Sequence, residues 1–228
     1  MRIVCFDIDG TLIHTAGAGR RAIHRALLDV LGSAGPIDTF RFDGRTDGEI
    51  VLRLAEAAGI ATDEGLVARV LDRYVALLAS ELNADGRHTL VYPGILPLLT
   101  ALEKRRDAVL GLLTGNVERG ARLKLRSAHI DPDRFRVGAF GNDSHVRAEL
   151  PAVAQRRASE LLGSAVRGHD VVIIGDTPAD MTCGQGIGAR PIGVGTAAYR
   201  PAELDAAGAA VSFANLGDTD AVLEAVFG

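Results

Sequence analysis

The chain is poor in the residues that mark several classes of protein. Its 228 residues include no tryptophan, two cysteines and two lysines. Cys5 and Cys183 lie in an apolar run and a glycine-rich stretch, which favours reduced thiols over the disulfide framework of a small secreted domain. No segment approaches the roughly 20 apolar residues of a membrane span. The first apolar run stops at Asp7, too soon for a signal peptide. These absences predict a cytoplasmic protein that does not contact a membrane.

A strong charge of either sign is also missing. The formal net charge is -4 at pH 7, and no segment is polybasic, so neither nucleic acid nor an anionic membrane surface is an expected partner. Hydrophobic residues make up 47% and charged residues 24% of the chain, as in an ordinary globular protein. This length suits one α/β domain, or a core domain with a modest insertion.

Short and nearly continuous apolar runs predict strands that are covered on both faces. They span residues 3–6, 108–113, 171–174 and 190–194, with a weaker candidate at 137–140. Segments with helical spacing lie between or beside the later runs, at residues 94–105, 117–128, 149–162 and 178–187. This alternation predicts a doubly wound parallel sheet with helices on both sides, which is an α/β fold.

Residues 14–90 have a different character, because their apolar positions recur at helical spacing and no strong strand pattern is present. Three helices are expected there, at about 18–31, 47–58 and 63–82. Thr46 and Glu49 form a capping box for the second of them. We therefore predict a helical domain at 14–90, inserted after the first strand of a core that comprises residues 1–13 and 91–228.

Polar residues follow three of the predicted strands at the point where each strand ends. They are Asp7, Asp9 and Gly10 after the first run, Thr114, Gly115 and Asn116 after the second, and Asp176 and Asp180 after the third. Ligands of doubly wound sheets bind beyond these carboxyl ends, so we expect one shared crevice. Crowded carboxylates repel one another unless a cation lies among them, and Mg²⁺ prefers such oxygen ligands. Aspartate can also act as a nucleophile that becomes phosphorylated.

Three segments, "DIDGTL", "LLTGN" and "GDTPADM", occur in this order on this scaffold. They resemble three signature motifs of the haloacid dehalogenase (HAD) superfamily of phosphohydrolases, and the arrangement is most similar to its phosphoglycolate-phosphatase-like members. The resemblance covers the core over nearly the whole chain. The helical insertion resembles the type 1 cap of this superfamily.

The resemblance implies a role for each matching residue. Asp7 would be the nucleophile that attacks phosphorus, and Asp9 would protonate the leaving oxygen and then act as the base for water. Mg²⁺ would be held by the Asp7 carboxylate, the Asp9 backbone carbonyl and the Asp176 side chain, with Asp180 as a ligand or a partner of the ligands. The Thr114 hydroxyl would bind a phosphate oxygen, together with backbone N–H groups around Gly10, Gly115 and Asn116.

The remaining signature of the family is a lysine, and here the sequence departs from the pattern. Lys104 precedes the "LLTGN" strand and Lys124 lies well inside the helix after it, so neither is expected to be well placed. Arg147 stands in a segment that resembles the relevant loop, and we predict that it replaces the lysine and clamps phosphate oxygens in a bidentate manner. Arg45, on a loop of the insertion, is a candidate substrate contact. The alternative for Arg45 is a solvated arginine beside the capping box.

Several interpretations stay open at this point. Asp7 and Asp9 suit a turn at the end of a strand, and Asp180 suits the first turn of a helix, without any catalytic role. The leading function is Mg²⁺-dependent hydrolysis of a small phosphorylated metabolite, phosphoglycolate-like or a sugar phosphate. A phosphomutase of the β-phosphoglucomutase type and a non-catalytic phosphate-binding protein are the alternatives. Asp9 argues against a dehalogenase, and the lack of lysine in residues 14–90 argues against a phosphonatase. The sequence does not define the oligomeric state.

Overall fold

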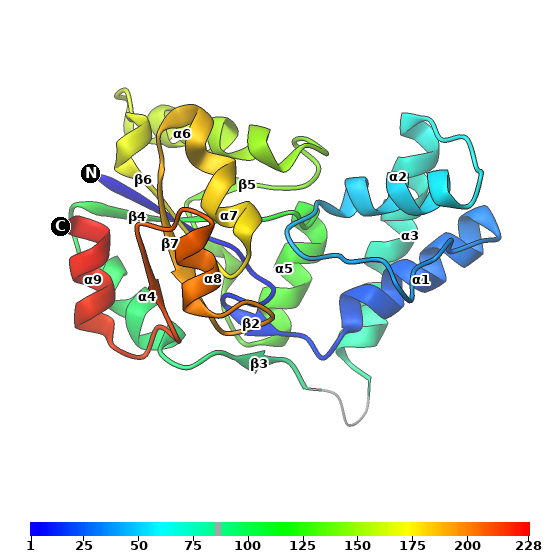
Figure 1. Ribbon diagram of the computed structural model, residues 1–228, viewed down its shortest axis with the longest axis horizontal. Coiled ribbons are helices and arrows are strands. Elements are labelled where there is room, and N and C mark those ends of the chain that lie inside the picture. Colours follow the sequence, from blue (N-terminus) through cyan, green and yellow to red (C-terminus); the bar gives the residue numbers. More distant parts are fainter. Residues whose placement is uncertain (85–87) are drawn as a thin grey trace.

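The computed structural model describes residues 1–84 and 88–228; the predicted insertion at 14–90 contains the three remaining residues (Figure 1). A six-stranded parallel sheet has the order β5-β4-β1-β6-β7-β8. Its strands are β1 (Arg2–Phe6), β4 (Ala108–Leu113), β5 (Val137–Ala139), β6 (Val171–Gly175), β7 (Arg190–Val194) and β8 (Val211–Phe213). The predicted doubly wound α/β sheet is therefore confirmed, with β1 at its centre between β4 and β6.

Helices cover both faces of this sheet. They are α4 (Ile95–Glu103), α5 (Glu118–Ser127), α6 (Leu150–Leu162), α7 (Pro178–Cys183), α8 (Pro201–Ala206) and α9 (Thr219–Phe227). Successive strand residues point to opposite faces, so Val4 and Phe6 pack with α4, α5 and α9, while Ile3 and Cys5 pack with α6. Burial on both faces explains why the central strands are apolar without alternation.

Three helices follow the first strand: α1 (Ala18–Leu31), α2 (Asp47–Ala57) and α3 (Glu64–Leu82). They match the predicted helices, and they share a hydrophobic cluster that includes Ile23, Leu54 and Leu78. Thr46 caps α2 by accepting a hydrogen bond from the Glu49 backbone N–H at 3.1 Å. We call the described residues 15–84 the helical unit. Figure 1 shows it to one side of the sheet, away from both chain termini.

The chain leaves the sheet domain and returns to it through two short strands. β2 (Ile13–His14) and β3 (Leu90–Val91) form an antiparallel pair in which Ile13 lies opposite Val91. The sequence pattern did not predict this pair, nor β8, α8 and α9. Within residues 1–84 and 88–228, no helix combines the length and the apolar character needed to cross a bilayer.

Candidate active site

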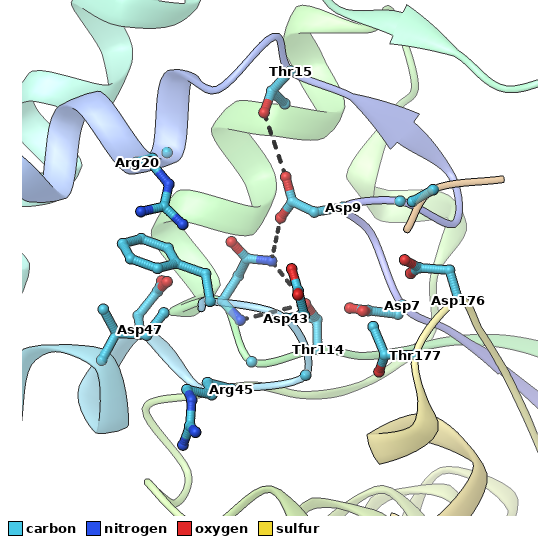
Figure 2. Close-up of a pocket in the computed structure, with 18 of the residues that line it drawn as sticks. Asp7, Asp9, Thr15, Arg20, Asp43, Arg45, Asp47, Thr114, Asp176 and Thr177 are labelled. Atoms are coloured by element: carbon cyan, nitrogen blue, oxygen red, sulfur yellow. Dashed lines mark hydrogen bonds between the residues drawn. The ribbon is translucent and has the colours of Figure 1, made fainter. Parts of the chain in front are cut away.

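A cavity of about 300 Å³ lies between the carboxyl ends of the central strands and the helical unit (Figure 2). The loops after β1, β4 and β6 supply its acidic and amide groups, and α1, α2 and α3 supply the opposite wall. All eight of the strand-end residues singled out in the sequence lie at or beside this cavity. Those that line it directly are Asp7, Asp9, Gly10, Thr114, Gly115, Asn116 and Asp176.

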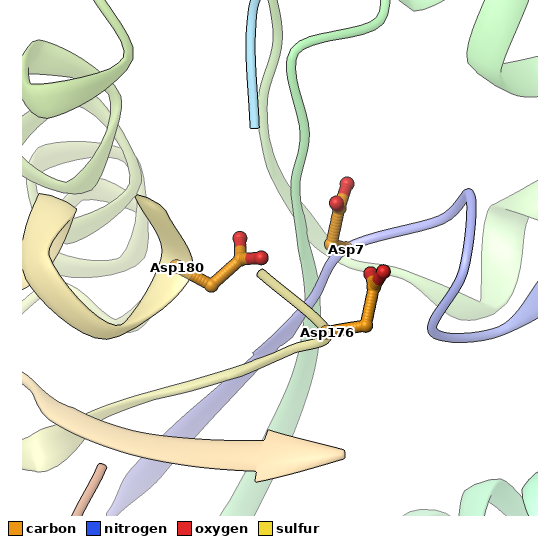
Figure 3. Close-up of side chains that lie close together, drawn as sticks. All are labelled: Asp7, Asp176 and Asp180. Atoms are coloured by element: carbon orange, nitrogen blue, oxygen red, sulfur yellow. The ribbon is translucent and has the colours of Figure 1, made fainter. Parts of the chain in front are cut away.

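Three carboxylates meet at the base of the cavity. Asp7, Asp176 and Asp180 each offer an oxygen, and these atoms all lie within 4.8 Å of one another (Figure 3). All three side chains are buried. Burial raises the pKa of Asp7 to about 6, against the opposing charge of Arg147. Burial, then the charges of Asp180 and Asp7, raise the pKa of Asp176 well above its usual value. The cluster therefore resists full ionisation unless a cation neutralises it.

The three carboxylates differ in their other partners. Asp180 contacts the Arg147 guanidinium through Oδ1, and its Oδ2 accepts hydrogen bonds from the Thr177 backbone N–H (3.0 Å) and hydroxyl (2.7 Å). Asp176 Oδ1 accepts one from the Thr11 hydroxyl at 2.9 Å. Asp180 is thus a member of the cluster and also a capping residue of α7.

The charges of this cluster suit a divalent cation. Three carboxylates and the guanidinium of Arg147 leave two negative charges uncompensated when all are ionised. The donors are hard oxygens, and the less engaged ones belong to Asp7 and Asp176. Gly10 permits the close approach of the two loops, because it has a φ of +87° and an added Cβ would lie 2.2 Å from Asp176 Oδ2. The Gly10 N–H donates to the Ile13 carbonyl (3.0 Å), so this donor is engaged within its own turn.

Arg147 lies beside the candidate nucleophile. Its Nη2 is 3.3 Å from Asp7 Oδ2, and it also contacts Asp180. Burial alone lowers the pKa of this guanidinium, but the charges of Asp180 and Asp7 outweigh burial and raise it. Its Nε is buried and has no hydrogen-bond partner within the described part of the chain. The position is that of a fixed cation next to the atom that would attack phosphorus.

Lys124 also reaches the site, and the expectation that it is badly placed was wrong. Its Nζ lies 2.6 Å from Asp9 Oδ2 and 2.5 Å from Asn116 Oδ1, and the side chain is buried. Side chains on a helix tilt toward its N-terminus, so a long side chain in the second turn of α5 reaches back to the residues before the helix. Burial lowers the pKa of Lys124, but negative groups, Asp9 first, outweigh it and raise that pKa.

Amide and hydroxyl groups complete the floor of the cavity. Asn116 Nδ2 donates to Asp9 Oδ2 (2.9 Å) and to the Thr114 hydroxyl oxygen (2.8 Å). The Thr114 hydroxyl in turn hydrogen-bonds Asp7, which lowers the pKa of that carboxyl and partly opposes burial. This chain of contacts connects Asp9 to Asp7 through side chains of the loop after β4.

Arg45 lines the cavity from the helical unit. Its guanidinium pairs with Glu49 and lies 5.3 Å from the centre of the Phe40 ring. The side chain is 38% exposed, and in the view of Figure 2 it points away from Asp7 and Asp176. Both interpretations of Arg45 therefore have support: it borders the cavity, and it is ion-paired at the start of α2.

The helical unit is docked on the loop after β4. The Asp47 backbone N–H donates to the Gly115 carbonyl at 2.7 Å, and the Asp47 carboxylate accepts from the Val117 N–H at 2.9 Å. The Thr46 hydroxyl donates to the His145 carbonyl at 2.8 Å. Asp47 is buried, and burial raises its pKa to about 6. No sequence pattern marked this residue beyond its place in the first turn of α2.

The chain is similar to known proteins in sequence and in fold. A family model described as haloacid dehalogenase-like hydrolase matches residues 1–188. Over 229 residues the chain is 30% identical to a phosphoglycolate phosphatase of Rhodospirillum rubrum, covering 95% of this chain and 90% of that protein. A crystal structure of a hydrolase from Pseudomonas syringae, 20% identical, covers 100% of this chain and 99% of its own with a TM-score of 0.76.

A second solved structure is a CbbY mutant from Rhodobacter sphaeroides in complex with xylulose-(1,5)bisphosphate. It is 19% identical, covers 96% of each chain and has a TM-score of 0.74. The chain therefore belongs to the haloacid dehalogenase-like hydrolase family. Within that family it is a phosphatase, a phosphoric monoester hydrolase similar to the phosphoglycolate phosphatases.

Proposed function

We propose that the protein is a Mg²⁺-dependent phosphatase of a small phosphate monoester and that it works through an aspartyl-phosphate on Asp7. One observation carries this proposal: Asp7 lies beside Arg147 and Asp176 at the base of a cavity that also contains Asp9. One small substrate in this cavity can therefore contact a nucleophile, a cation that binds phosphate, the acidic metal ligands and a second carboxylate.

The proposed reaction has two displacements. A carboxylate oxygen of Asp7 attacks phosphorus, the ester P–O bond breaks, and Asp9 gives a proton to the departing oxygen, which leaves as an alcohol. Water then attacks phosphorus and loses a proton to Asp9 while the bond between phosphorus and the Asp7 oxygen breaks. Inorganic phosphate leaves, and both carboxyl groups return to their first state. Arg147 and the Thr114 hydroxyl bind the phosphoryl oxygens and hold them in line.

The metal would be held by the Asp7 and Asp176 side chains together with the Asp9 backbone carbonyl. Asp180, with both oxygens engaged, would position Arg147 and approach the ion as a further ligand. When bound, Mg²⁺ would neutralise negative charge on the carboxylates and on the phosphoryl group. The two uncompensated negative charges of the cluster support this assignment.

We further propose that the helical unit is a cap domain, at residues 14–90, on a core of residues 1–13 and 91–228. Its contacts with the loop after β4 close the cavity and exclude bulk water while the substrate is bound. The small cavity favours a phosphoglycolate-like or sugar-phosphate substrate, with Arg45 as a contact from the cap. The relatives named phosphoglycolate phosphatase support the first of these substrates. We place the enzyme in the cytoplasm.

A screen of phosphorylated metabolites with Mg²⁺, scored as released inorganic phosphate, tests the proposal. We expect activity that EDTA abolishes, that Mg²⁺ restores and that Asp7→Asn lacks. Transfer of phosphate to a sugar instead of water would identify a phosphomutase. Tight binding of a phosphorylated ligand without any release of phosphate would identify a binding protein. Robust activity of Asp7→Asn would refute the assigned nucleophile.

A further inference from the structure

Lys124 is a buried charge that the proposed reaction does not use. An ammonium group has three N–H donors, and a buried one needs an acceptor for each. Two donors of Lys124 point to Asp9 Oδ2 (2.6 Å) and Asn116 Oδ1 (2.5 Å), both in the core. The hydroxyl of Tyr74, on α3, lies near this ammonium group: an added Cβ at Gly19 would be 3.3 Å from Lys124 Nζ and 3.8 Å from the Tyr74 hydroxyl. The core and the helical unit thus together supply the polar groups around this buried ammonium group.

All three helices of the helical unit approach this one atom. Tyr74 from α3 and Asp47 from the start of α2 line the same cavity as Lys124. Gly19, in the first turn of α1, lies so close that an added Cβ would be 3.3 Å from Lys124 Nζ. The surroundings of Lys124 are therefore complete only while the helical unit is packed on the core.

The same contact makes the two oxygens of Asp9 unequal. Oδ2 accepts hydrogen bonds from both Lys124 and Asn116. Oδ1 has the Thr15 hydroxyl at 3.5 Å, the outer limit of a hydrogen bond. Anchoring of Oδ2 by two strong donors leaves Oδ1 as the oxygen that is available to carry and transfer a proton.

On the basis of the proposed function, we infer that Lys124 is a positioning residue for the acid–base step and that closure of the helical unit completes its setting. The proton leaves Asp9 Oδ1 for the ester oxygen as the P–O bond breaks. The ammonium stabilises the carboxylate that remains, and water returns the proton to Oδ1 in the second displacement. When the helical unit is displaced, Lys124 loses Tyr74 and Asp47, and Asp9 loses its fixed orientation.

The inference is tested by comparing two leaving groups in the Lys124→Met variant. An alkyl phosphate from the metabolite screen needs protonation of its leaving oxygen, whereas p-nitrophenyl phosphate expels a stable phenolate with little need for an acid. The ratio kcat/KM reports the steps up to leaving-group departure. We expect a loss of about 10²-fold for the alkyl phosphate, the lower end of what general acid catalysis contributes, and at most about threefold for the aryl phosphate. A purely structural role would lower both values together.

Tyr74→Phe is the second variant, because it removes only the hydroxyl and keeps the buried ring. We expect this variant to lower kcat/KM by about three- to tenfold for the alkyl phosphate and by less for the aryl phosphate. If Lys124→Met does not fold, Tyr74→Phe tests the inference by itself. The control is Lys104→Met, the exposed second lysine of the chain, which should behave as wild type.

Equal losses on both substrates, or full activity of Lys124→Met on the alkyl phosphate, would overturn the inference. A wild-type enzyme that releases phosphate from neither substrate would overturn the proposed function instead, so the two failures are distinguishable. Circular dichroism and thermal unfolding of each variant show whether the fold is retained.

Discussion

Asp47 accepts a hydrogen bond from the backbone N–H of Val117 at 2.9 Å, and this contact joins α2 to the residue that precedes α5. The Asp47 N–H donates in return to the Gly115 carbonyl at 2.7 Å. The loop between β4 and α5 carries Thr114 and Asn116. The start of the helical unit is therefore fastened to the loop that forms the floor of the cavity, and changes at this contact should affect both stability and catalysis.

The Asp47 contact predicts a dependence of stability on pH. Burial, opposed in part by Lys124, raises the pKa of Asp47 to about 6, whereas an unfolded aspartate titrates near 3.9. A raised pKa means that the folded state binds the proton more tightly, so this residue's contribution to stability is present below about pH 4 and is lost as pH rises through 6. Asp47→Asn keeps an acceptor for the Val117 N–H but cannot ionise.

We therefore expect Asp47→Asn to be more stable than wild type above pH 6, by at most about 3 kcal/mol, with no difference below about pH 4. Urea unfolding between pH 4 and pH 8, in EDTA, measures this difference. Because Asp7 and Asp176 titrate in both proteins, their contribution cancels in the comparison. A variant that is less stable than wild type at pH 7.5 would contradict the prediction.

Gly115→Ala should prevent the helical unit from docking. An added Cβ at Gly115 would lie 2.1 Å from the backbone oxygen of Arg45, and backbone cannot yield as a flexible side chain does. We expect a loss of about 1–3 kcal/mol in stability and at least a tenfold loss in kcat/KM, because the cavity no longer closes. Gly186→Ala is the matched control, since nothing lies within 4 Å of its added Cβ. Wild-type kinetics in Gly115→Ala would show that this docking is not needed.

Mg²⁺ should stabilise the protein, and more strongly at higher pH. The pKa values of Asp7 and Asp176 are raised by burial, so below about pH 6 protons compete with the ion for these carboxylates. Mg²⁺ at a hundredfold excess over its Kd should stabilise the fold by about 2.7 kcal/mol. Differential scanning fluorimetry at pH 5.5 and pH 8 measures the shift in Tm.

The shift should disappear in Asp176→Asn and persist in Asp205→Asn, which removes an exposed carboxylate of α8. An equal shift in both variants would place the ion somewhere other than the acidic cluster.

Arg147 should matter for both folding and phosphate binding. Its removal leaves Asp180, which is fully buried, without its charged partner, and such losses typically cost about 3–5 kcal/mol. Arg147→Ala should therefore unfold more readily and lose at least about 10²-fold in kcat/KM. Arg147→Lys keeps the charge but not the planar fork, so it should restore most of the stability and only part of the activity.

Steady-state kinetics and the inhibition constant of inorganic phosphate measure these effects. Unchanged turnover and phosphate affinity in Arg147→Ala would exclude it as the phosphate clamp.

The central strands and the three helices of the helical unit follow from local patterns in the sequence. Strands buried on both faces read as continuous apolar runs, and α1 to α3 show helical spacing, with a recognisable cap at Thr46. Short elements gave no such signal. β2 and β3 have two residues each, and β8 has three residues that are only partly buried, so their periodicity cannot be detected.

The acidic cluster was predictable because the topology of a parallel sheet brings the ends of β1, β4 and β6 together. Lys124 was missed because it does not follow a strand. It lies eight residues after Asn116, and only the direction of its side chain along α5 brings it to Asp9. Asp47 was missed for another reason: its burial depends on how the helical unit meets the core, which no local pattern encodes.

The antiparallel pair of β2 and β3 means that the chain departs from the sheet and comes back at neighbouring points, since Ile13 lies opposite Val91. The register of the six parallel strands therefore does not depend on the length or shape of the segment between β2 and β3. A different intervening piece would therefore leave the strand ends that hold Asp7 and Asp176 in place, whereas the surroundings of Lys124 would change with it. Grafting the equivalent piece of a relative at these two positions is the corresponding route for engineering.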